Sequence, residues 1–292
     1  MILVLGGHGQ LGTELVLRAA EAKVPLTAVS HTEVDVADPK TIARAVAKYR
    51  PTLIVNAAAY NNVDRAETQS AQAQRTNALG ASVAAASAKR AGVPIIHVST
   101  DYVFDGQKTT AYVEDDPAGP LSVYGRTKQK GEEGVRNGHP HHLILRTSWL
   151  FGIHGSNFVK TVVRLAGERD VLGFVAAQRG TPTSTWDLAK AILTAAEAIA
   201  SGKEAWGTYH VAGSGATSRH GMATAIVAAQ SRFTGRNPPI EVIAVPENAA
   251  PRPANSALDS SKFAATFGFA AGDWRDAVER TVNLLFAKQG KI

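Results

Sequence analysis

The chain has 292 residues, 45% of them hydrophobic, with no cysteine and a formal net charge of +6. This composition excludes a disordered or fibrous protein, and the lack of cysteine excludes disulfides, thiolate metal sites and cysteine nucleophiles. The positive charge favours an anionic ligand, but lysine and arginine are scattered singly along the chain, which argues against nucleic acid as a partner.

The first half of the chain alternates short apolar runs with longer helical patterns. Apolar, β-branched runs predict strands at residues 2–5, 26–30, 53–56, 95–99 and 143–147. The periodicity between them predicts helices near residues 11–22, 39–49, 76–91 and 124–135. Several strands are continuous apolar runs, as expected when helices cover both faces of a parallel sheet. The pattern predicts an α/β protein with a doubly wound parallel sheet.

After about residue 150, glycine and proline interrupt this alternation. We expect a helix from Trp186, a strand at 209–212, a proline-bearing stretch at 238–253 and a last helix at 275–286. The domain prediction assigns residues 1–150 and 183–215 to a dinucleotide-binding domain. Residues 151–182 and 216–292 then form a smaller, mainly C-terminal substrate lobe, which closes over the carboxyl edge of the sheet.

Nothing in the sequence suggests a membrane protein. Met1 leads straight into an apolar run, which leaves no room for a signal peptide, and no apolar stretch is long enough to span a bilayer. We therefore expect a cytoplasmic protein with no membrane partner.

A glycine loop joins the first predicted strand to the first helix. Without side chains, its residues let the backbone turn tightly and approach a pyrophosphate, whose charge lies against the helix N-terminus. The spacing fits both G-x-x-G-x-x-G and G-x-G-x-x-G, so it does not separate the Rossmann subclasses. The expected cofactor contacts are Gly6, Gly9, Gln10, Leu11 and Gly12, and the minor alternative is a purely structural turn.

The end of the second predicted strand bears on the choice between NAD and NADP. A carboxylate there would hold the ribose 2′-hydroxyl of NAD, whereas Ser30 and His31 leave space for the 2′-phosphate of NADP. We therefore expect NADPH as the cofactor, with NADH as the alternative because Glu33 is close by. Asp35 and Val36 are expected to contact adenine, although Asp35 fits a turn or cap position equally well.

Tyr124 and Lys128 are four residues apart in a predicted helix, so both project from one face. Reduction of a ketone needs a proton donor for the oxygen that receives negative charge, and a phenol serves when a lysine cation lowers its pKa. Thr100 follows the predicted strand 95–99 and is the candidate to hydrogen-bond the carbonyl oxygen. The Tyr–Lys pair is common by chance, but its order after the glycine loop and Thr100 points to an oxidoreductase.

Six runs spread over almost the whole chain carry a family resemblance. They are NAAAY at 56–60, VDRAE at 63–67, STDYVFDG at 99–106, YGRTK at 124–128, RTSWLFG at 146–152 and RPANS at 252–256. These runs resemble those of the dTDP-4-dehydrorhamnose reductases, a family of extended short-chain dehydrogenases with a Rossmann-type sheet. The resemblance implies reduction of the 4-keto group of a nucleotide sugar, dTDP-4-dehydro-L-rhamnose, with NAD(P)H.

The resemblance also implies roles for individual residues. Thr100, Tyr124 and Lys128 would be catalytic, with Tyr124 the proton donor, and the last two would also contact the cofactor. Further cofactor contacts are expected from Ala58, Ala59, Tyr60 and Asn61. Two positions depart from the family pattern, because Asn61 stands where a threonine is expected and Ser30 where many members carry an acidic residue.

The expected substrate contacts are Thr100, Asp101, Trp149, Asn157 and Arg252. Trp149 would form a flat apolar wall for the sugar, with an ordinary core position as the alternative. Asn157 and Arg252 would contact the phosphates, arginine being suited to bidentate pairing, unless they are surface residues.

Several alternatives stay open. Some family members bind magnesium at a dimer contact, and Glu14 and Asp187 are the candidate counterparts here, but the full ligand set is not evident and we predict no metal. A second candidate function is another nucleotide-sugar reductase or epimerase, and a third is a non-catalytic NADP-binding subunit like the regulatory subunit of methionine adenosyltransferase. The joint presence of Thr100, Tyr124 and Lys128 argues against the third. The assembly is expected to be a monomer or a homodimer.

Overall fold

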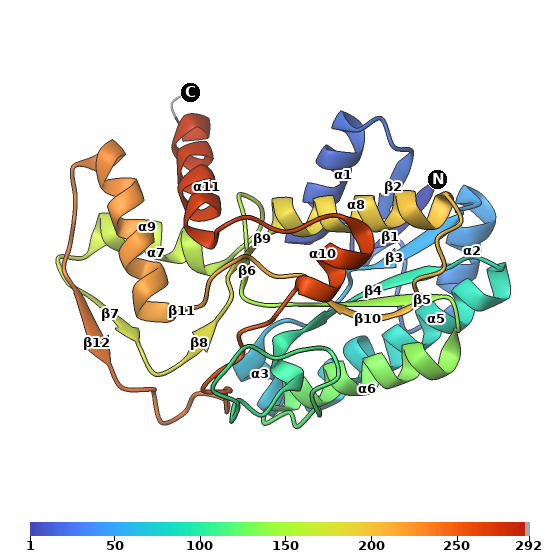
Figure 1. The fold of residues 1–292 in the computed structure, drawn as a ribbon, viewed down its shortest axis with the longest axis horizontal. Helices are drawn as coiled ribbons and strands as arrows, with labels where there is room; N and C mark the ends of the chain where they lie inside the picture. The colour runs from blue at the N-terminus through green and yellow to red at the C-terminus, as the bar shows by residue number, and fades with distance from the viewer. Residues whose placement is uncertain (290–292) are drawn as a thin grey trace.

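Six parallel strands form the central sheet of the computed structural model, which describes residues 1–289 (Figure 1). From one edge to the other the strands are β10 (Gly207–His210), β5 (His142–Thr147), β4 (Ile95–Thr100), β3 (Leu53–Asn56), β1 (Ile2–Leu5) and β2 (Leu26–Val29). The chain runs from β1 outward to β2 and then crosses back to β3, so the order of the strands reverses between β1 and β3. Open α/β sheets bind ligands outside the carboxyl ends of the strands at such a point.

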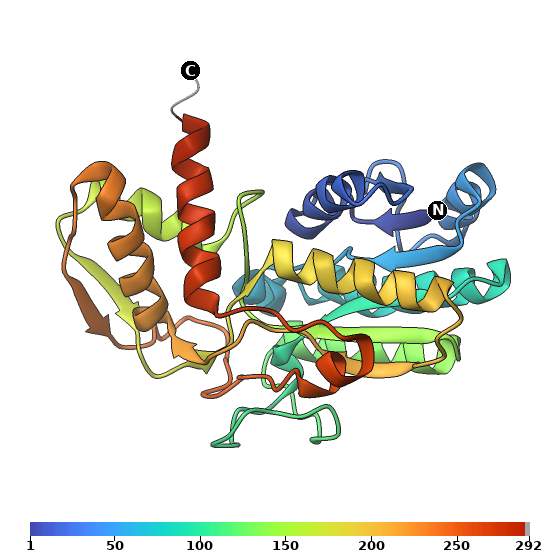
Figure 2. The same ribbon diagram turned by 45° about the horizontal axis from the view of Figure 1, so that its top comes forward.

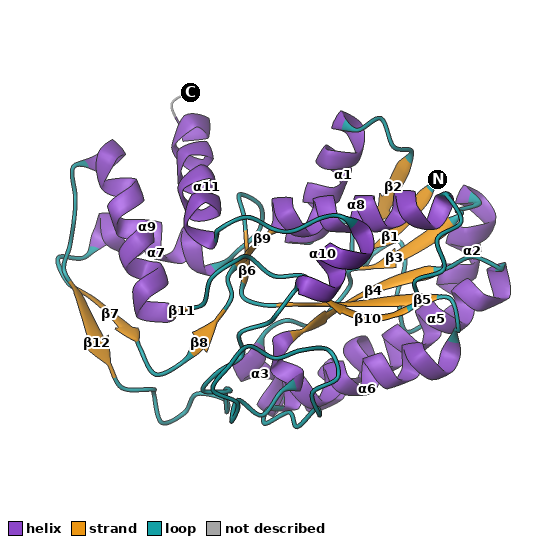
Figure 3. Ribbon diagram, in the orientation of Figure 1, coloured by secondary structure: helices purple, strands orange, loops and turns teal. Residues whose placement is uncertain are grey.

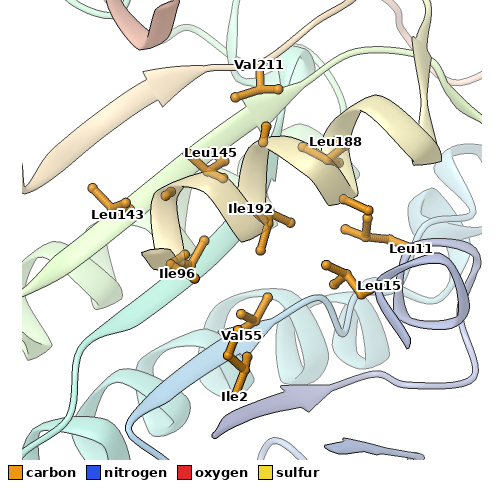
Figure 4. Close-up of a cluster of buried hydrophobic side chains, with 14 of the residues drawn as sticks. Ile2, Leu11, Leu15, Val55, Ile96, Leu143, Leu145, Leu188, Ile192 and Val211 are labelled. Atoms are coloured by element: carbon orange, nitrogen blue, oxygen red, sulfur yellow. The ribbon is translucent and has the colours of Figure 1, made fainter. Parts of the chain in front are cut away.

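Helices cover both faces of the sheet, which confirms the doubly wound fold (Figure 3). Alternate residues of β1 point to opposite faces, with Ile2 and Val4 in one apolar cluster and Leu3 and Leu5 in the other. The first cluster is closed by α1 (Gln10–Glu21), α8 (Thr185–Ala200) and α10 (Ser261–Phe267). The second is closed by α2 (Pro39–Tyr49), α5 (Gly80–Ala91) and α6 (Val123–Gly138). Figure 4 shows the first cluster, in which Leu188 and Ile192 of α8 lie over the sheet.

A further apolar cluster lies beside the sheet and not on it (Figure 2). It is built from α7 (Phe158–Glu168), α9 (Arg219–Thr234) and α11 (Trp274–Gln289), with β7 (Leu172–Val175) paired to β12 (Ile240–Ile243). Two short strand pairs link this part to the sheet, β6 (Leu150–Phe151) with β9 (Thr183–Ser184) and β8 (Arg179–Gly180) with β11 (Thr217–Ser218). Most of these elements fall in the predicted lobe 151–182 and 216–292, but α10 packs on the sheet, and residues 290–292 lie outside the described residues. The domain division stays a prediction.

The predicted strands and helices of the first half are confirmed, with small differences at their ends. The helical segment predicted at 76–91 is longer and more broken than expected. It consists of α3 (Val63–Thr68), α4 (Ser70–Ala73), the π-helical turn η1 (Gln74–Leu79) and α5. Helix propensities of single residues do not predict a π-helical turn, because the extra residue in the turn depends on packing against neighbouring elements. The last sheet strand is β10, at 207–210 and not 209–212. Within residues 1–289, no helix combines the length and the apolar character needed to cross a membrane.

A buried ion cluster holds α6 against β4 and β5. The fully buried Glu132 carboxylate accepts hydrogen bonds from Arg146 Nε and Nη2 at 2.9 and 2.8 Å and from Ser99 Oγ at 2.6 Å. Arg136 adds a further hydrogen bond at 2.6 Å. Burial by itself would raise the pKa of Glu132, but the hydrogen bonds and charge of Arg146, with Ser99 and Arg136, hold that pKa below its ordinary value. The cluster fixes the helix that carries the predicted tyrosine and lysine.

Glu132→Ala should lower the free energy of unfolding by about 3–5 kcal/mol, because Arg146 would be left buried without its counter-ion. Urea denaturation at neutral pH measures this loss. Glu168→Ala, which breaks an exposed ion pair with Arg164, is the matched control and should change stability by less than about 1 kcal/mol. Because the folded-state pKa of Glu132 lies below that of the unfolded chain, its contribution is present above the unfolded pKa and disappears as the pH falls. Equal losses in the two variants would contradict this account.

Candidate active site

The glycine loop after β1 folds closely on itself and leads directly into α1. A Cβ atom at Gly12 would lie 2.4 Å from the carbonyl oxygen of Gly6, so only glycine permits this approach. The N-cap of α1 is Gly9, which has no side chain to satisfy the free N–H groups of the first turn. The positive end of the helix dipole and these N–H groups therefore suit an anion, and the loop fits the pyrophosphate of a dinucleotide.

Two adjoining cavities open at the carboxyl edge of the sheet. The first has a volume of about 540 Å³ and the second about 660 Å³. Both are lined by His8, Gly9, Ala57, Ala59 and Asn61, so they form one continuous cleft. The predicted residues in the first cavity are Gly9, Gln10, Leu11, Gly12, Ala59, Asn61, Thr100, Asp101, Tyr124, Lys128, Trp149 and Asn157. Those in the second are Gly6, Gly9, His31, Asp35, Val36, Ala58, Ala59, Tyr60 and Asn61.

The three predicted catalytic residues meet in the first cavity from two elements. Thr100 ends β4, while Tyr124 and Lys128 lie one turn apart on α6. The Ser122 hydroxyl caps α6 by accepting a hydrogen bond from the N–H of Gly125 at 3.1 Å. A Cβ at Gly125 would lie 2.3 Å from the nearest carbonyl oxygen of the short helix η2 (Asp101–Val103), so glycine there lets α6 approach the end of β4.

Burial moves the pKa values of Tyr124 and Lys128 in opposite directions. It raises the pKa of Tyr124 above that of a free phenol, and a hydrogen bond with the Thr100 hydroxyl only partly offsets this. It lowers the pKa of Lys128 to about 8, against the opposing charge of Glu132. At neutral pH the phenol therefore keeps its proton and the lysine is largely charged.

One expectation about Tyr124 is wrong. The sequence suggested that Lys128 would bring the pKa of this phenol towards neutrality, but that pKa is raised. The reason is that burial has the largest effect, and Lys128 directs its Nζ to the carbonyl oxygen of Val98 at 2.7 Å.

Thr100 is oriented by a buried network of hydroxyl and carboxyl groups. Its Oγ1 donates to Asp101 Oδ1 at 3.0 Å and accepts from the N–H of Tyr102 at 3.2 Å. Ser148 Oγ donates to Asp101 Oδ2 at 2.8 Å. Burial raises the pKa of Asp101, and the hydroxyls of Ser256, Ser148 and Thr100 partly counter that rise. Asp101 thus positions Thr100 in addition to lining the cavity.

Trp149 forms one wall of the first cavity, and an arginine that the sequence analysis missed lies against it. Trp149 is 9% exposed and adopts a left-handed backbone conformation with φ of 47°. The guanidinium of Arg219 lies 3.8 Å from the centre of the Trp149 ring system and 4.9 Å from that of Phe158. Arg219 belongs to no recognisable motif, and its position as the first residue of α9 gives no local signal for a site.

Asn157 and Asp35 line the cleft and also make structural hydrogen bonds. Asn157 caps α7, and its Nδ2 donates to the carbonyl oxygen of Gly152 at 2.7 Å and to Gln10 Oε1 at 3.0 Å. Asp35 Oδ1 accepts from the N–H of Ala37 at 2.9 Å, which is the turn that the sequence allowed, and its other oxygen pairs with Arg75. Arg75 also lines the second cavity and was not predicted.

Two predicted contact residues, Ser30 and Arg252, lie outside the lining of both cavities. Ser30 is buried, and its hydroxyl bonds to Thr32 at 2.8 Å and to Glu33 at 2.9 Å within its own loop. Arg252 Nη2 donates to both carboxylate oxygens of Asp64 at 2.8 Å. Sequence position alone does not show that these side chains bond to other protein groups.

Within residues 1–289, no group of three or more histidine, aspartate or glutamate side chains is arranged to hold a metal ion. Glu14 pairs with Arg18 at 3.0 Å and accepts from Thr185 Oγ1 at 3.3 Å. Asp187 accepts a hydrogen bond from the Ser184 hydroxyl and lies 3.5 Å from Arg280 Nη2.

Comparison with known proteins agrees with the resemblance seen in the sequence. The family model described as the RmlD substrate binding domain matches residues 1–286. A dTDP-4-dehydrorhamnose reductase of Sinorhizobium fredii is 40% identical over 286 residues, covering 96% of each protein. A solved dTDP-4-dehydrorhamnose reductase of Clostridium acetobutylicum is 33% identical with a TM-score of 0.89, covering 98% of this chain and 99% of that one.

A second solved structure, the dTDP-4-dehydrorhamnose reductase of Bacillus anthracis in complex with NADP, is 31% identical with a TM-score of 0.89. The match covers 97% of this chain and 98% of that one. These similarities extend over the sheet, the glycine loop and the part of the chain that carries α7, α9 and α11. The protein therefore belongs to the dTDP-4-dehydrorhamnose reductase family of Rossmann-type oxidoreductases.

Proposed function

We propose that this protein reduces the 4-keto group of dTDP-4-dehydro-L-rhamnose with NADPH and forms dTDP-L-rhamnose. The observation that carries the proposal is the meeting of Thr100, Tyr124 and Lys128 in a cavity that continues into the cleft beside the glycine loop. Membership in a family whose relatives are named for this reaction supports the choice of substrate.

In the proposed mechanism, the glycine loop would hold the cofactor, which would supply the hydride for the carbonyl carbon of the substrate. Tyr124, protonated at neutral pH, gives its proton to the keto oxygen as that oxygen takes up negative charge, which completes the alcohol. Thr100 hydrogen-bonds the same oxygen and keeps it facing the phenol. The Lys128 ammonium stabilises the phenolate that forms, until a proton from solvent restores the phenol.

The assignment of NADPH, with NADH as the alternative, rests on the end of β2. Glu33 accepts hydrogen bonds from both the N–H and the hydroxyl of Ser30 at 2.9 Å, so its carboxylate is held by its own loop. Both bonds go to the same oxygen, Oε2 of Glu33. The residues directly after β2, Ser30 and His31, carry no carboxylate to select the 2′-hydroxyl of NAD. The NADP complex of the Bacillus anthracis relative supports the same assignment.

Tyr124→Phe should lower kcat by about 100- to 10,000-fold, because the keto oxygen loses its proton donor. Loss of NADPH absorbance with dTDP-4-dehydro-L-rhamnose measures turnover, and fluorescence titration with NADPH should show unchanged cofactor affinity. Tyr209→Phe is the matched control, since Tyr209 is also buried but donates its hydroxyl to the carbonyl oxygen of Ala205, outside the cleft. Its kcat should equal that of the wild type.

Two outcomes would count against the proposal. Near-normal turnover by Tyr124→Phe would remove Tyr124 as proton donor. A wild-type protein that binds NADPH but reduces no 4-keto nucleotide sugar would favour the non-catalytic binding role, and turnover of a different nucleotide sugar would favour another reductase of the superfamily.

The pH dependence of kcat/KM should report the charge on Lys128. Because burial lowers its pKa to about 8, the ammonium is present below that pH and is lost as the pH rises through it. We expect kcat/KM to fall above about pH 8. Lys128→Arg keeps a charge at all these pH values and should move the fall upward, while Lys128→Met should be slow and independent of pH in this range. If kcat/KM of both variants fell at the same pH as that of the wild type, the fall would not report the charge on Lys128.

A further inference from the structure

Arg219 packs against two aromatic rings at the wall of the first cavity. It is the first residue of α9, and its guanidinium lies between the aromatic rings of Trp149 and Phe158, at 3.8 and 4.9 Å from their centres. Both rings, like Arg219 itself, line the cavity. A guanidinium that stacks on an aromatic face keeps the N–H groups at its edge available for planar, bidentate hydrogen bonds.

Arg219 forms no ion pair among the described residues, although its side chain hydrogen-bonds to Tyr102 and the charge of Asp101 acts on it. The nearby Asp101 carboxylate accepts hydrogen bonds from the hydroxyls of Thr100 and Ser148. Arg252 is a second nearby cation and adds to the positive charge, although Asp64 pairs with it. Burial lowers the pKa of Arg219, and the charge of Asp101 and the hydrogen bond with Tyr102 only partly oppose this.

We propose that Arg219, stacked on Trp149, binds the diphosphate of the nucleotide-sugar substrate. This inference rests on the proposed function, because it places the keto sugar beside Thr100 and Tyr124. The diphosphate is attached to that sugar, so its negative charge must lie close to the same residues. An arginine in the lining of the same cavity meets this requirement, and its fork of N–H groups matches phosphate oxygens.

The geometry favours Arg219 over the two residues that the sequence suggested for the phosphates. Arg252 lies outside the cavity lining, and one edge of its guanidinium is used by Asp64. Asn157 lines the cavity, but its amide N–H groups donate to Gly152 and Gln10. Asn157 therefore supports the loop that precedes α7, and Arg219 supplies the charge.

Arg219→Met removes the charge and keeps an apolar stem of similar length against Trp149. We expect KM for dTDP-4-dehydro-L-rhamnose to rise about 10- to 100-fold with kcat within about threefold of wild type, since a charged hydrogen bond to substrate is lost. Calorimetric titration with dTDP should show a similar loss of affinity, and added salt should weaken dTDP binding less in the variant than in the wild type. Affinity for NADPH should not change.

Two further variants make the test specific. Arg275→Met is the matched control, because its guanidinium stacks on Trp274 at 4.6 Å but lies outside the cavity, and it should bind dTDP like the wild type. Arg219→Lys keeps a charge without the planar fork and should recover part of the lost affinity. If Arg219→Met does not fold, the affinity for dTDP is measured with Arg219→Lys instead. We expect this variant to bind dTDP several-fold more weakly than the wild type does.

The results separate this inference from the proposed function. Unchanged dTDP affinity and KM in folded Arg219→Met, or in Arg219→Lys where the first variant does not fold, would overturn the role of Arg219 even if the enzyme is active. Loss of dTDP binding in a protein that reduces no 4-keto nucleotide sugar would support the diphosphate site and refute the proposed reaction.

Discussion

The ion pair between the buried carboxylate of Glu132 and the guanidinium of Arg146 holds together the elements on which the candidate active site depends. Glu132 lies on α6, one turn beyond Lys128, while Arg146 lies on β5 and Ser99, which also bonds to Glu132, lies on β4. α6 carries the tyrosine and the lysine of the site, and β4 ends at its threonine. β5 leads to the tryptophan that forms one wall of the cavity. β4 and β5 are paired in the sheet, and the buried Glu132 carboxylate ties α6 to both strands. Breaking the ion pair would leave a charge inside the protein.

Burial also decides the protonation states in the cleft. The same desolvation raises the pKa of Tyr124 and lowers that of Lys128, because it disfavours the anion of one and the cation of the other. The Tyr124 phenol therefore keeps its proton at neutral pH. The pKa of Lys128, about 8, lies close to neutrality.

The cleft is organised by charge along its length. The N-terminus of α1 and its glycine loop have backbone N–H groups that suit one diphosphate, as predicted for that of the cofactor. The wall formed by Trp149 and Arg219 offers a side-chain cation to a second, that of the substrate. The predicted catalytic residues lie in the cavity that both of these features line. Two separate anion sites in one cleft suit the simultaneous binding of a dinucleotide and a nucleotide sugar, which agrees with the family to which the chain belongs.

Local sequence patterns were sufficient to predict the sheet strands, the glycine loop and the placing of Tyr124 and Lys128 on one helix face. Each of these depends on residues close together in the chain, where periodicity and turn chemistry act directly. Only the tertiary structure showed that Ser30 and Arg252 bond to other protein groups, that Arg219 stacks on Trp149, and that the pKa of Tyr124 rises. Partner choice and desolvation depend on segments far apart in the sequence. Arg219 and Trp149, from separate parts of the chain, become neighbours only when α9 packs against the loop that follows β5.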